Sequence, residues 1–151
     1  MILNLGCGTN PILRAGAINH DRVRHHDYVD TWFDLNEYPW AFDDQTVDEI
    51  YAMDVLEHLD NAVWALEECW RILKPAGILH LRVPYGMGEN ALTDPTHRTH
   101  FMPKSVDYFI RGTEFEREYG YYSQMRWVLV SFEWNHADDN IYWTLQKDEP
   151  A

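Results

Sequence analysis

The chain opens on a short apolar run that ends in a glycine turn, and this feature constrains the fold more than any other. The run is MILNL (residues 1–5), and GCGTNP (residues 6–11) follows it. A short apolar run bounded by turn residues is typical of a buried strand. Two glycines let the backbone bend sharply and approach a ligand closely, because no Cβ collides with it. A tight turn also needs glycine without any ligand, so the turn alone does not establish a binding site.

Further strand-like runs follow the glycine turn at regular intervals. Apart from the opening run, we predict strands over 16–21, 29–35, 46–54, 77–85, 124–134 and 140–147. The last two are joined by the turn-like segment NHADDN and suit a hairpin. No repeat, low-complexity tract or linker interrupts the pattern, so we expect a single domain over residues 1–151.

One helix is clear and a second, shorter one is expected. Val63, Leu66, Trp70 and Leu73 recur at helical spacing. We expect Asp60 to cap this helix and residues 74–77, which include Pro75 and Gly77, to end it. The short helix is predicted from about Pro103 to just before Gly112. Strands that alternate with helices indicate an α/β fold with a mostly parallel sheet covered on both faces, and the final hairpin would add an antiparallel edge.

Composition and charge narrow the functional classes. Apolar residues make up 46% of the chain, which suits a globular protein, and the formal net charge is −13. An acidic surface repels phosphate backbones, so nucleic acid is an unlikely partner, and the basic cluster over residues 14–26 is read as a solvated loop. With two cysteines, no signal-peptide pattern and no apolar stretch of membrane length, we expect a soluble, cytoplasmic protein and no membrane association.

Two carboxylates sit where they could complete a binding site with the glycine turn. Asp21 ends the second predicted strand, where it could accept both hydroxyls of a ribose. Asp34 ends the third, where it could accept from an adenine amino group beside the Leu35 backbone. Pro11 occupies the third glycine position of the dinucleotide fingerprint, which disfavours NAD. The pattern therefore favours an adenosine pocket.

These segments resemble a known family. The order LNLGCGTNP, AINHD, DLNEYPW and then VDEIYAMDVLEHLDNAVWALEECWRILKPAGILHLRVPY is similar to class I S-adenosylmethionine-dependent methyltransferases, and most similar to their small type 11 group. The resemblance covers most of residues 1–110. It implies a Rossmann-like, doubly wound, mostly parallel sheet of about seven strands with an antiparallel C-terminal hairpin. It also implies N-terminal cover helices, which are missing here, so we expect an open cofactor pocket that a second copy of the chain or another partner would cover.

The resemblance implies a set of residues around S-adenosylmethionine as cofactor. Two departures from the family pattern are Asn4, where an acidic residue is usual, and Asn10, where a third glycine is usual. The methionine and ribose portions would lie at the glycine turn, the ribose hydroxyls at the second strand, the adenine at the third, and the sulfonium after the fourth. The implied cofactor-binding residues are Asn4, Gly6, Cys7, Gly8, Asp21, Asp34, Leu35, Met53 and Asp54.

The methyl acceptor is expected on the far side of the sulfonium. The loop after residue 85 contains DPTHRTHF, in which Asp94 could orient His97 as a general base. His58 could reach either the cofactor or the acceptor. Asp94, His97 and His100 are also metal-ligand residue types, but no second ligand pair stands out, so we predict no metal. The competing structural interpretation is that this loop caps the next helix and places Phe101 in the core.

We therefore predict a methyltransferase that acts on a small-molecule or protein acceptor. The alternative is a non-catalytic module that binds S-adenosylmethionine or S-adenosylhomocysteine and regulates or completes a partner, which the departure at Asn4 would suit. A dinucleotide or nucleotide-sugar enzyme is a third, weaker interpretation. Methylation of nucleic acid is disfavoured, because MDVLEH follows the fourth strand in place of an N/D-P-P-Y/F motif and Cys69 falls inside a helix.

Overall fold

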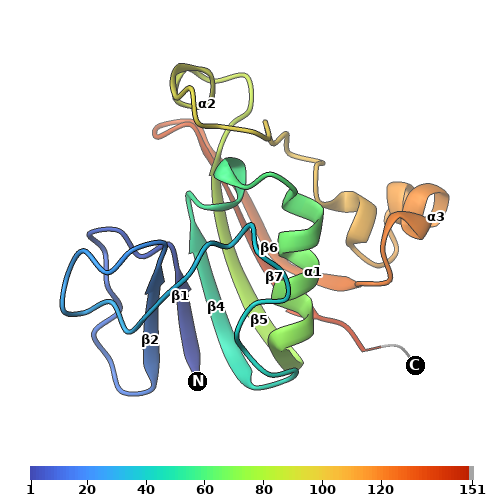
Figure 1. Cartoon of the computed structure of the whole chain (residues 1–151). Coiled ribbons are helices and arrows are strands. Elements are labelled where there is room, and N and C mark those ends of the chain that lie inside the picture. The colour runs from blue at the N-terminus through green and yellow to red at the C-terminus, as the bar shows by residue number, and fades with distance from the viewer. Residues whose placement is uncertain (150–151) are drawn as a thin grey trace.

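Seven strands form one sheet in the computed structural model, which describes residues 1–149 (Figure 1). In chain order the strands are β1 (Ile2–Leu5), β2 (Ala17–Asp21), β3 (Thr31–Trp32), β4 (Val47–Met53), β5 (Leu73–Pro84), β6 (Trp127–Asn135) and β7 (Asn140–Lys147). Their order across the sheet is β3-β2-β1-β4-β5-β7-β6. Strand β7 is antiparallel to β5 and β6, and the other pairings are parallel. The predicted mostly parallel sheet with an antiparallel C-terminal hairpin is confirmed.

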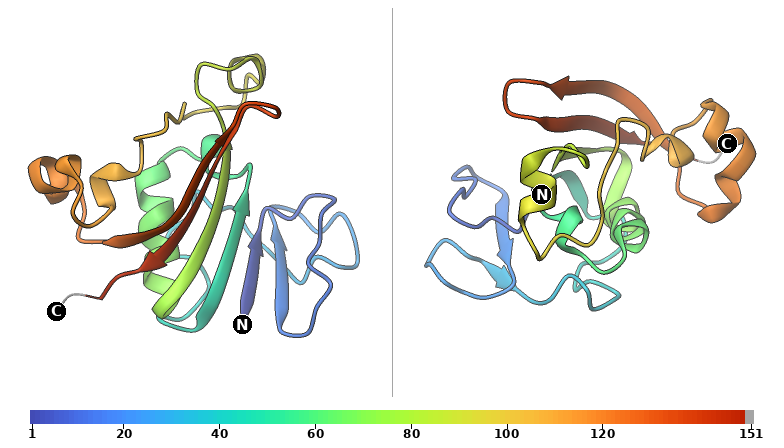
Figure 2. Two further views of the ribbon diagram at one scale, coloured as in Figure 1. Left: turned by 180° about the vertical axis from the view of Figure 1, so that it is seen from behind. Right: turned by 90° about the horizontal axis from the view of Figure 1, so that it is seen from above.

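The sheet order creates one place where ligands collect. Strand β1 lies between β2 and β4. Strands β2 and β3 extend the sheet on one side of β1, and the strands from β4 onward extend it on the other side. The crevice beyond the carboxyl ends of strands at such a reversal is the usual ligand site of open α/β sheets. Figure 2 shows this end of the sheet from above, with the loops after β1, β2 and β4 grouped around it.

Helix α1 (Ala62–Ile72) packs against β5 and runs directly into it. Its buried side chains are Ala65, Leu66, Cys69 and Ile72. Of the predicted stripe, Leu66 is buried, Val63 and Trp70 are half-buried, and Leu73 already belongs to β5. The predicted cap is wrong by one residue: the Asn61 side chain, not that of Asp60, accepts the hydrogen bond from the Trp64 amide at 3.1 Å. Strand β5 also begins at Leu73, four residues early, because Leu73 already pairs with Val47 across a register shift.

The loops and short helices depart most from the sequence prediction. Strand β3 is only two residues long, and the connections between β1 and β4 contain no helix. The connection after β3 still packs on the core through the buried side chains of Leu35 and Trp40. Helix α2 (Glu89–Thr93) lies inside a predicted loop, while the helix predicted from Pro103 reduces to a 3₁₀ turn, η2 (Asp107–Phe109). Helix α3 (Glu114–Tyr119) begins after Gly112, which has a φ of +86°, and the Thr113 hydroxyl caps it.

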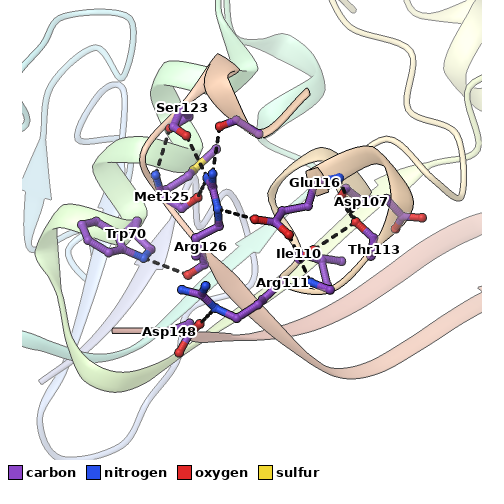
Figure 3. A network of polar contacts seen from close by, with 12 residues as sticks. Trp70, Asp107, Ile110, Arg111, Thr113, Glu116, Ser123, Met125, Arg126 and Asp148 are labelled. Carbon is purple, nitrogen blue, oxygen red and sulfur yellow. Dashed lines mark hydrogen bonds and ion pairs between the residues drawn. The ribbon is translucent and has the colours of Figure 1, made fainter. Parts of the chain in front are cut away.

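A hydrogen-bond network around Arg126 connects helix α3 and the turn that follows it to helix α1 (Figure 3). The Arg126 guanidinium donates to the Glu116 carboxylate on α3 at 2.9 Å and to the Gly120 carbonyl at 2.9 Å. Its own carbonyl accepts from the Trp70 indole of α1 at 3.0 Å. Trp127, the next residue, is fully buried in the core. None of the helices in residues 1–149 has both the length and the apolar character that a membrane crossing requires.

Candidate functional site

The glycine turn after β1 is held over the end of β2. Gly6 and Gly8 have φ values of +57° and +49°, a region that favours glycine. The Cys7 amide donates to the His20 carbonyl at 2.8 Å, and the Gly8 amide donates to the Asp21 carboxylate at 2.8 Å. A Cβ on Gly6 would lie 2.6 Å from a methyl group of Val55. The turn therefore needs glycine at position 6 for both backbone and space.

A cavity of about 290 Å³ opens beside this turn at the reversal of strand order. Six residues of its lining were named from the sequence: Gly6, Asp21, Asp34, Leu35, Asp54 and His58. Six others were missed as site residues: His20, Arg22, Phe33, Asn36, Val55 and Leu59. Most of the missed residues are adjacent in sequence to a predicted site residue. Their position at the predicted strand ends is therefore the signal that could have identified them.

Asp21 is the most strongly engaged carboxylate of this cavity. One of its oxygens accepts from the Gly8 amide and from His25 Nε2 at 3.1 Å, and the other accepts from the Arg22 amide at 2.6 Å. Burial acts to raise the pKa of Asp21, but these hydrogen bonds outweigh it and hold the pKa below its ordinary value. Asp21 is therefore ionised at neutral pH, as an acceptor for hydroxyl groups must be.

Asp34 lies across the cavity from the glycine turn. One of its oxygens accepts from the Asn36 amide at 2.9 Å, and the other pairs with the Arg22 guanidinium at 3.1 Å. Arg22 is solvated, as predicted, but it also reaches over the cavity. The neighbouring Leu35 carbonyl accepts from the buried Trp40 indole at 3.0 Å, which fixes the backbone at this position.

Four of the nine cofactor residues named from the sequence lie outside the lining of this cavity. The Asn4 amide group donates to the Asn10 carbonyl and to the Asn19 side chain, each at 3.0 Å, and braces the turn from below. Burial and the nearby Asp21 carboxylate raise the pKa of the Cys7 thiol to about 11, so it keeps its proton. The Gly8 amide donates a hydrogen bond to the Asp21 carboxylate. The Met53 side chain lies on the half-buried face of β4.

A second cavity, of about 310 Å³, adjoins the first and shares Asp54 and His58 with it. Its other lining residues are Glu57, Pro84, Asn90, Asp94, His97 and Asn140. It forms because the loop after α2 docks on the 3₁₀ turn η1 (Leu56–His58): the amides of Arg98 and Thr99 both donate to the Glu57 carbonyl, at 2.6 and 3.2 Å. The structure thus brings together the three residues predicted for the acceptor side, namely His58, Asp94 and His97.

Hydrogen bonds fix both imidazoles of this second cavity. The His97 Nδ1 lies 2.8 Å from the Ala91 carbonyl, which can only accept, so Nδ1 carries the proton. The Asp94 carboxylate is 3.6 Å from His97 Nε2 and so lies at the other nitrogen of the ring. The two imidazole rings meet edge to face, with 4.6 Å between their centroids. His100 is exposed and lies outside this group, while Phe101 is buried, as the structural interpretation of the loop predicted.

Four lining residues of the second cavity were not predicted from the sequence, namely Glu57, Pro84, Asn90 and Asn140, and Glu57 is the ionisable one. It is 1% exposed, and its Oε2 atom has no hydrogen-bond partner among the described residues. Burial raises the pKa of this carboxyl to about 8. The only signal in the sequence was its place in the segment MDVLEHL after the fourth predicted strand, where a glutamate normally suggests an exposed position.

Comparison with known proteins assigns the chain to a family. A family model described as a methyltransferase domain matches residues 3–81, more than half of the chain. The chain therefore belongs to this methyltransferase-domain family. The matched segment carries β1 to β4, α1 and most of β5, and with them nearly all of the first cavity. No curated protein matches the chain.

Solved structures with the same fold are numerous, and their sequences are distant. A chain from the complex between the Haloferax volcanii Trm112 methyltransferase activator and a methyltransferase is 16% identical, with a TM-score of 0.70 over 98% of this chain and 82% of that one. An Archaeoglobus fulgidus SAM-dependent methyltransferase is 15% identical, with a TM-score of 0.65 over 97% and 85%. The [4+2]-cyclase SpnF is 14% identical, with a TM-score of 0.67 over 99% and 74%. At these identities the likeness establishes the fold alone.

Proposed function

We propose that the protein is an S-adenosylmethionine-dependent methyltransferase that transfers a methyl group to a small-molecule or protein acceptor. The observation that carries this proposal is the convergence of the glycine turn, Asp21 and Asp34 on one cavity at the reversal of strand order. The fold class and the family are those of such enzymes.

The residues of the first cavity fit this cofactor. Asp21 would accept from the ribose hydroxyls, and Asp34 with the Leu35 backbone would hold the adenine. Gly6 would let the methionine portion lie close to the turn, and Asp54 would face the sulfonium, whose positive charge a carboxylate favours. S-adenosylmethionine, when bound, supplies an activated methyl group. The remaining cofactor residues named from the sequence, Asn4, Cys7, Gly8 and Met53, would shape the turn and the cavity wall.

The second cavity is the proposed acceptor side. Much of the acceleration in methyl transfer comes from aligning the two reactants, which the adjoining cavities would do through the shared Asp54 and His58. An acceptor that must lose a proton would give it to the Nε2 atom of His97, whose other nitrogen is already protonated. Asp94 would stabilise the imidazolium that forms, since its carboxylate lies 3.6 Å from this atom.

A non-catalytic cofactor-binding module is the second candidate. Two observations favour it: the usual acid is replaced by Asn4, and the connection from β1 to β2 contains no helix over the cavity. A relative of the same fold that is described as a cyclase also illustrates that this fold alone does not fix the reaction. In either case a second copy or a protein partner would cover the cavity, and one neighbour is known from a complex with an activator.

Turnover separates the two candidates. The purified protein is incubated with S-adenosylmethionine and a panel of phenols, amines, carboxylic acids and short peptides, and S-adenosylhomocysteine is followed by mass spectrometry. We expect formation of S-adenosylhomocysteine with at least one acceptor class, and its loss in His97→Gln. Binding of the cofactor without turnover across the panel would favour the regulatory module.

A further inference from the structure

We propose that Glu57, His58 and His97 bind one divalent transition-metal ion of the zinc type in the second cavity. One ligand atom from each of the three residues lies within 4.8 Å of the others. Ligand atoms about 2.0–2.2 Å from a common zinc ion lie about 3.3–3.6 Å apart, so the three side chains would have to approach one another on binding the ion. This assignment departs from the sequence prediction of no metal, and it does not use His100.

The hydrogen bonds around the two histidines leave one nitrogen atom of each ring available to bind a metal ion. The Thr96 hydroxyl lies 2.7 Å from the Asp94 carboxylate, to which it can only donate. It must therefore accept from His58 Nδ1, which lies 2.9 Å away. His97 Nδ1 likewise donates to the Ala91 carbonyl. Both imidazoles thus carry their proton on Nδ1 and keep the lone pair on Nε2, and this second layer of hydrogen bonds is the usual support of metal-bound histidine.

Glu57 supplies an independent reason for a cation. Its carboxyl group is almost completely buried, lines the cavity, and has an oxygen without a partner among the described residues. Burial of a carboxyl group with an unpaired oxygen costs free energy, unless a proton neutralises the group or a cation balances its charge. Two imidazole lone pairs beside it repel an added anion and attract a metal ion. Asp94 Oδ2, 3.6 Å from His97 Nε2, is placed to become a fourth ligand that an acceptor would displace.

A second group of potential ligands is less suited to this role. Cys7, Asp21 and His25 also offer atoms within 4.8 Å of one another. However, both oxygens of Asp21 already accept hydrogen bonds, and the Cys7 thiol retains its proton at neutral pH. A zinc-type ion needs the thiolate, so binding there would have to overcome the cost of deprotonation.

The position of the ion would restrict the acceptor, and this step rests on the proposed function. The second cavity meets the cofactor cavity at Asp54 and His58. An ion there would bind an oxygen or nitrogen atom of the acceptor and increase its acidity, so that the acceptor would release its proton to water. This would replace the general-base role proposed for His97, because the Nε2 lone pair would then be a ligand of the ion. The expected substrates are therefore acceptors with a coordinating hydroxyl, carboxylate or amine group.

Metal binding can be measured without any acceptor. The protein is dialysed against EDTA, freed of chelator and titrated with Zn²⁺ by calorimetry, and Co²⁺ is added to a second sample to record its visible absorption. We expect one equivalent of Zn²⁺ to bind with a Kd below about 10 µM, and at least about 10-fold weaker binding in each of Glu57→Gln and His97→Gln. His100→Gln is the matched control from the same loop, and His25→Gln tests the competing group; both should stay within about 2-fold of the unmodified protein.

Three outcomes would overturn the proposal. The first is a Kd above about 100 µM for the unmodified protein, and the second is binding that His25→Gln abolishes. The third is binding that His97→Gln leaves unchanged. If Glu57→Gln does not fold, His58→Gln replaces it under the same criterion. Titration of the metal-free protein with S-adenosylhomocysteine separates the two proposals, because the first cavity should still bind this compound when zinc binding fails.

Discussion

The two adjoining cavities share Asp54 and His58 but are built in different ways. The first cavity, which we propose as the cofactor cavity, is walled by the ends of β1, β2, β3 and β4 and by the turns that directly follow them. The second cavity, which we propose as the acceptor cavity, depends on a loop, residues 94–100, that is held on η1 by hydrogen bonds to the Glu57 carbonyl and between Thr96 and His58. Strand ends thus fix one half of the site locally, whereas the other half exists only after distant segments have docked.

The largest expected effect is on the affinity of the first cavity for S-adenosylhomocysteine. Asp21→Ala removes two charge-assisted hydrogen bonds to the ribose, worth roughly 3 kcal/mol or more together, and should weaken S-adenosylhomocysteine binding at least about 100-fold. Zinc affinity should not change. Calorimetric titration with each compound measures both, and Asp27→Ala, an exposed acid of the same segment, is the control. A decrease of less than about 3-fold would place the ribose elsewhere.

The second comparison is between Gly6 and Gly8, the two glycines of the turn after β1. Gly6→Ala adds a Cβ 2.6 Å from Val55 at a φ of +57°, and should lower the free energy of unfolding by about 2–4 kcal/mol. Gly8→Ala shares the positive φ but meets nothing within 4 Å, and should cost only about 1 kcal/mol. Urea unfolding curves give both values. Equal losses would mean that space at position 6 is not limiting.

These two regions also differ in how far the sequence could predict them. Gly6, Asp21 and Asp34 are placed by local pattern, because each follows a recognisable strand and parallel strands end at the same edge. Glu57 could not be predicted as buried, since its burial depends on residues 98–99, about 40 positions later, docking on its carbonyl.

The same distinction explains the errors in the C-terminal segment. The hairpin of β6 and β7 follows from alternating apolar runs and was predicted correctly. Helix α3 was missed although its Thr113 cap is a local signal. The Arg126 bonds to Glu116 and Gly120 that also hold this segment could not be read from local pattern. Local spacing around Pro103 suggested a helix, yet only a 3₁₀ turn forms there.

A pH dependence should arise from the cofactor side. Burial lowers the pKa of His20, whose ring accepts from the Gly6 amide and donates to the Phe33 carbonyl. The unfolded chain therefore binds a proton near pH 6.5 that the folded protein refuses, so stability falls as the pH drops below this value, by at most about 1.4 kcal/mol per pH unit. Glu57, whose pKa is raised to about 8, contributes the opposite slope over this range, so the test is a comparison of variants. In unfolding curves from pH 8 to 5, His20→Gln should gain stability relative to the unmodified protein as the pH falls, and the exposed His26→Gln should not.

The smallest expected effect is on the Zn²⁺ affinity of the second cavity. Thr96→Val removes the hydroxyl that links Asp94 to His58, and should weaken Zn²⁺ binding by about 10-fold. Thr96→Ser keeps the hydroxyl and should stay within about 2-fold of the unmodified protein, and neither change should alter S-adenosylhomocysteine affinity. Calorimetry with both ligands provides the measurement. Identical zinc affinities for the valine and serine variants would exclude a role for this hydrogen-bonded chain.

The central claim is that the cavity at the ends of β1, β2 and β4 holds S-adenosylmethionine. Its most direct test is a calorimetric titration of the purified, cofactor-free protein with S-adenosylhomocysteine, with NAD as the control ligand. We predict one binding site for S-adenosylhomocysteine and no heat of binding for NAD. A folded protein that binds NAD in preference, or that binds neither compound, would contradict the claim.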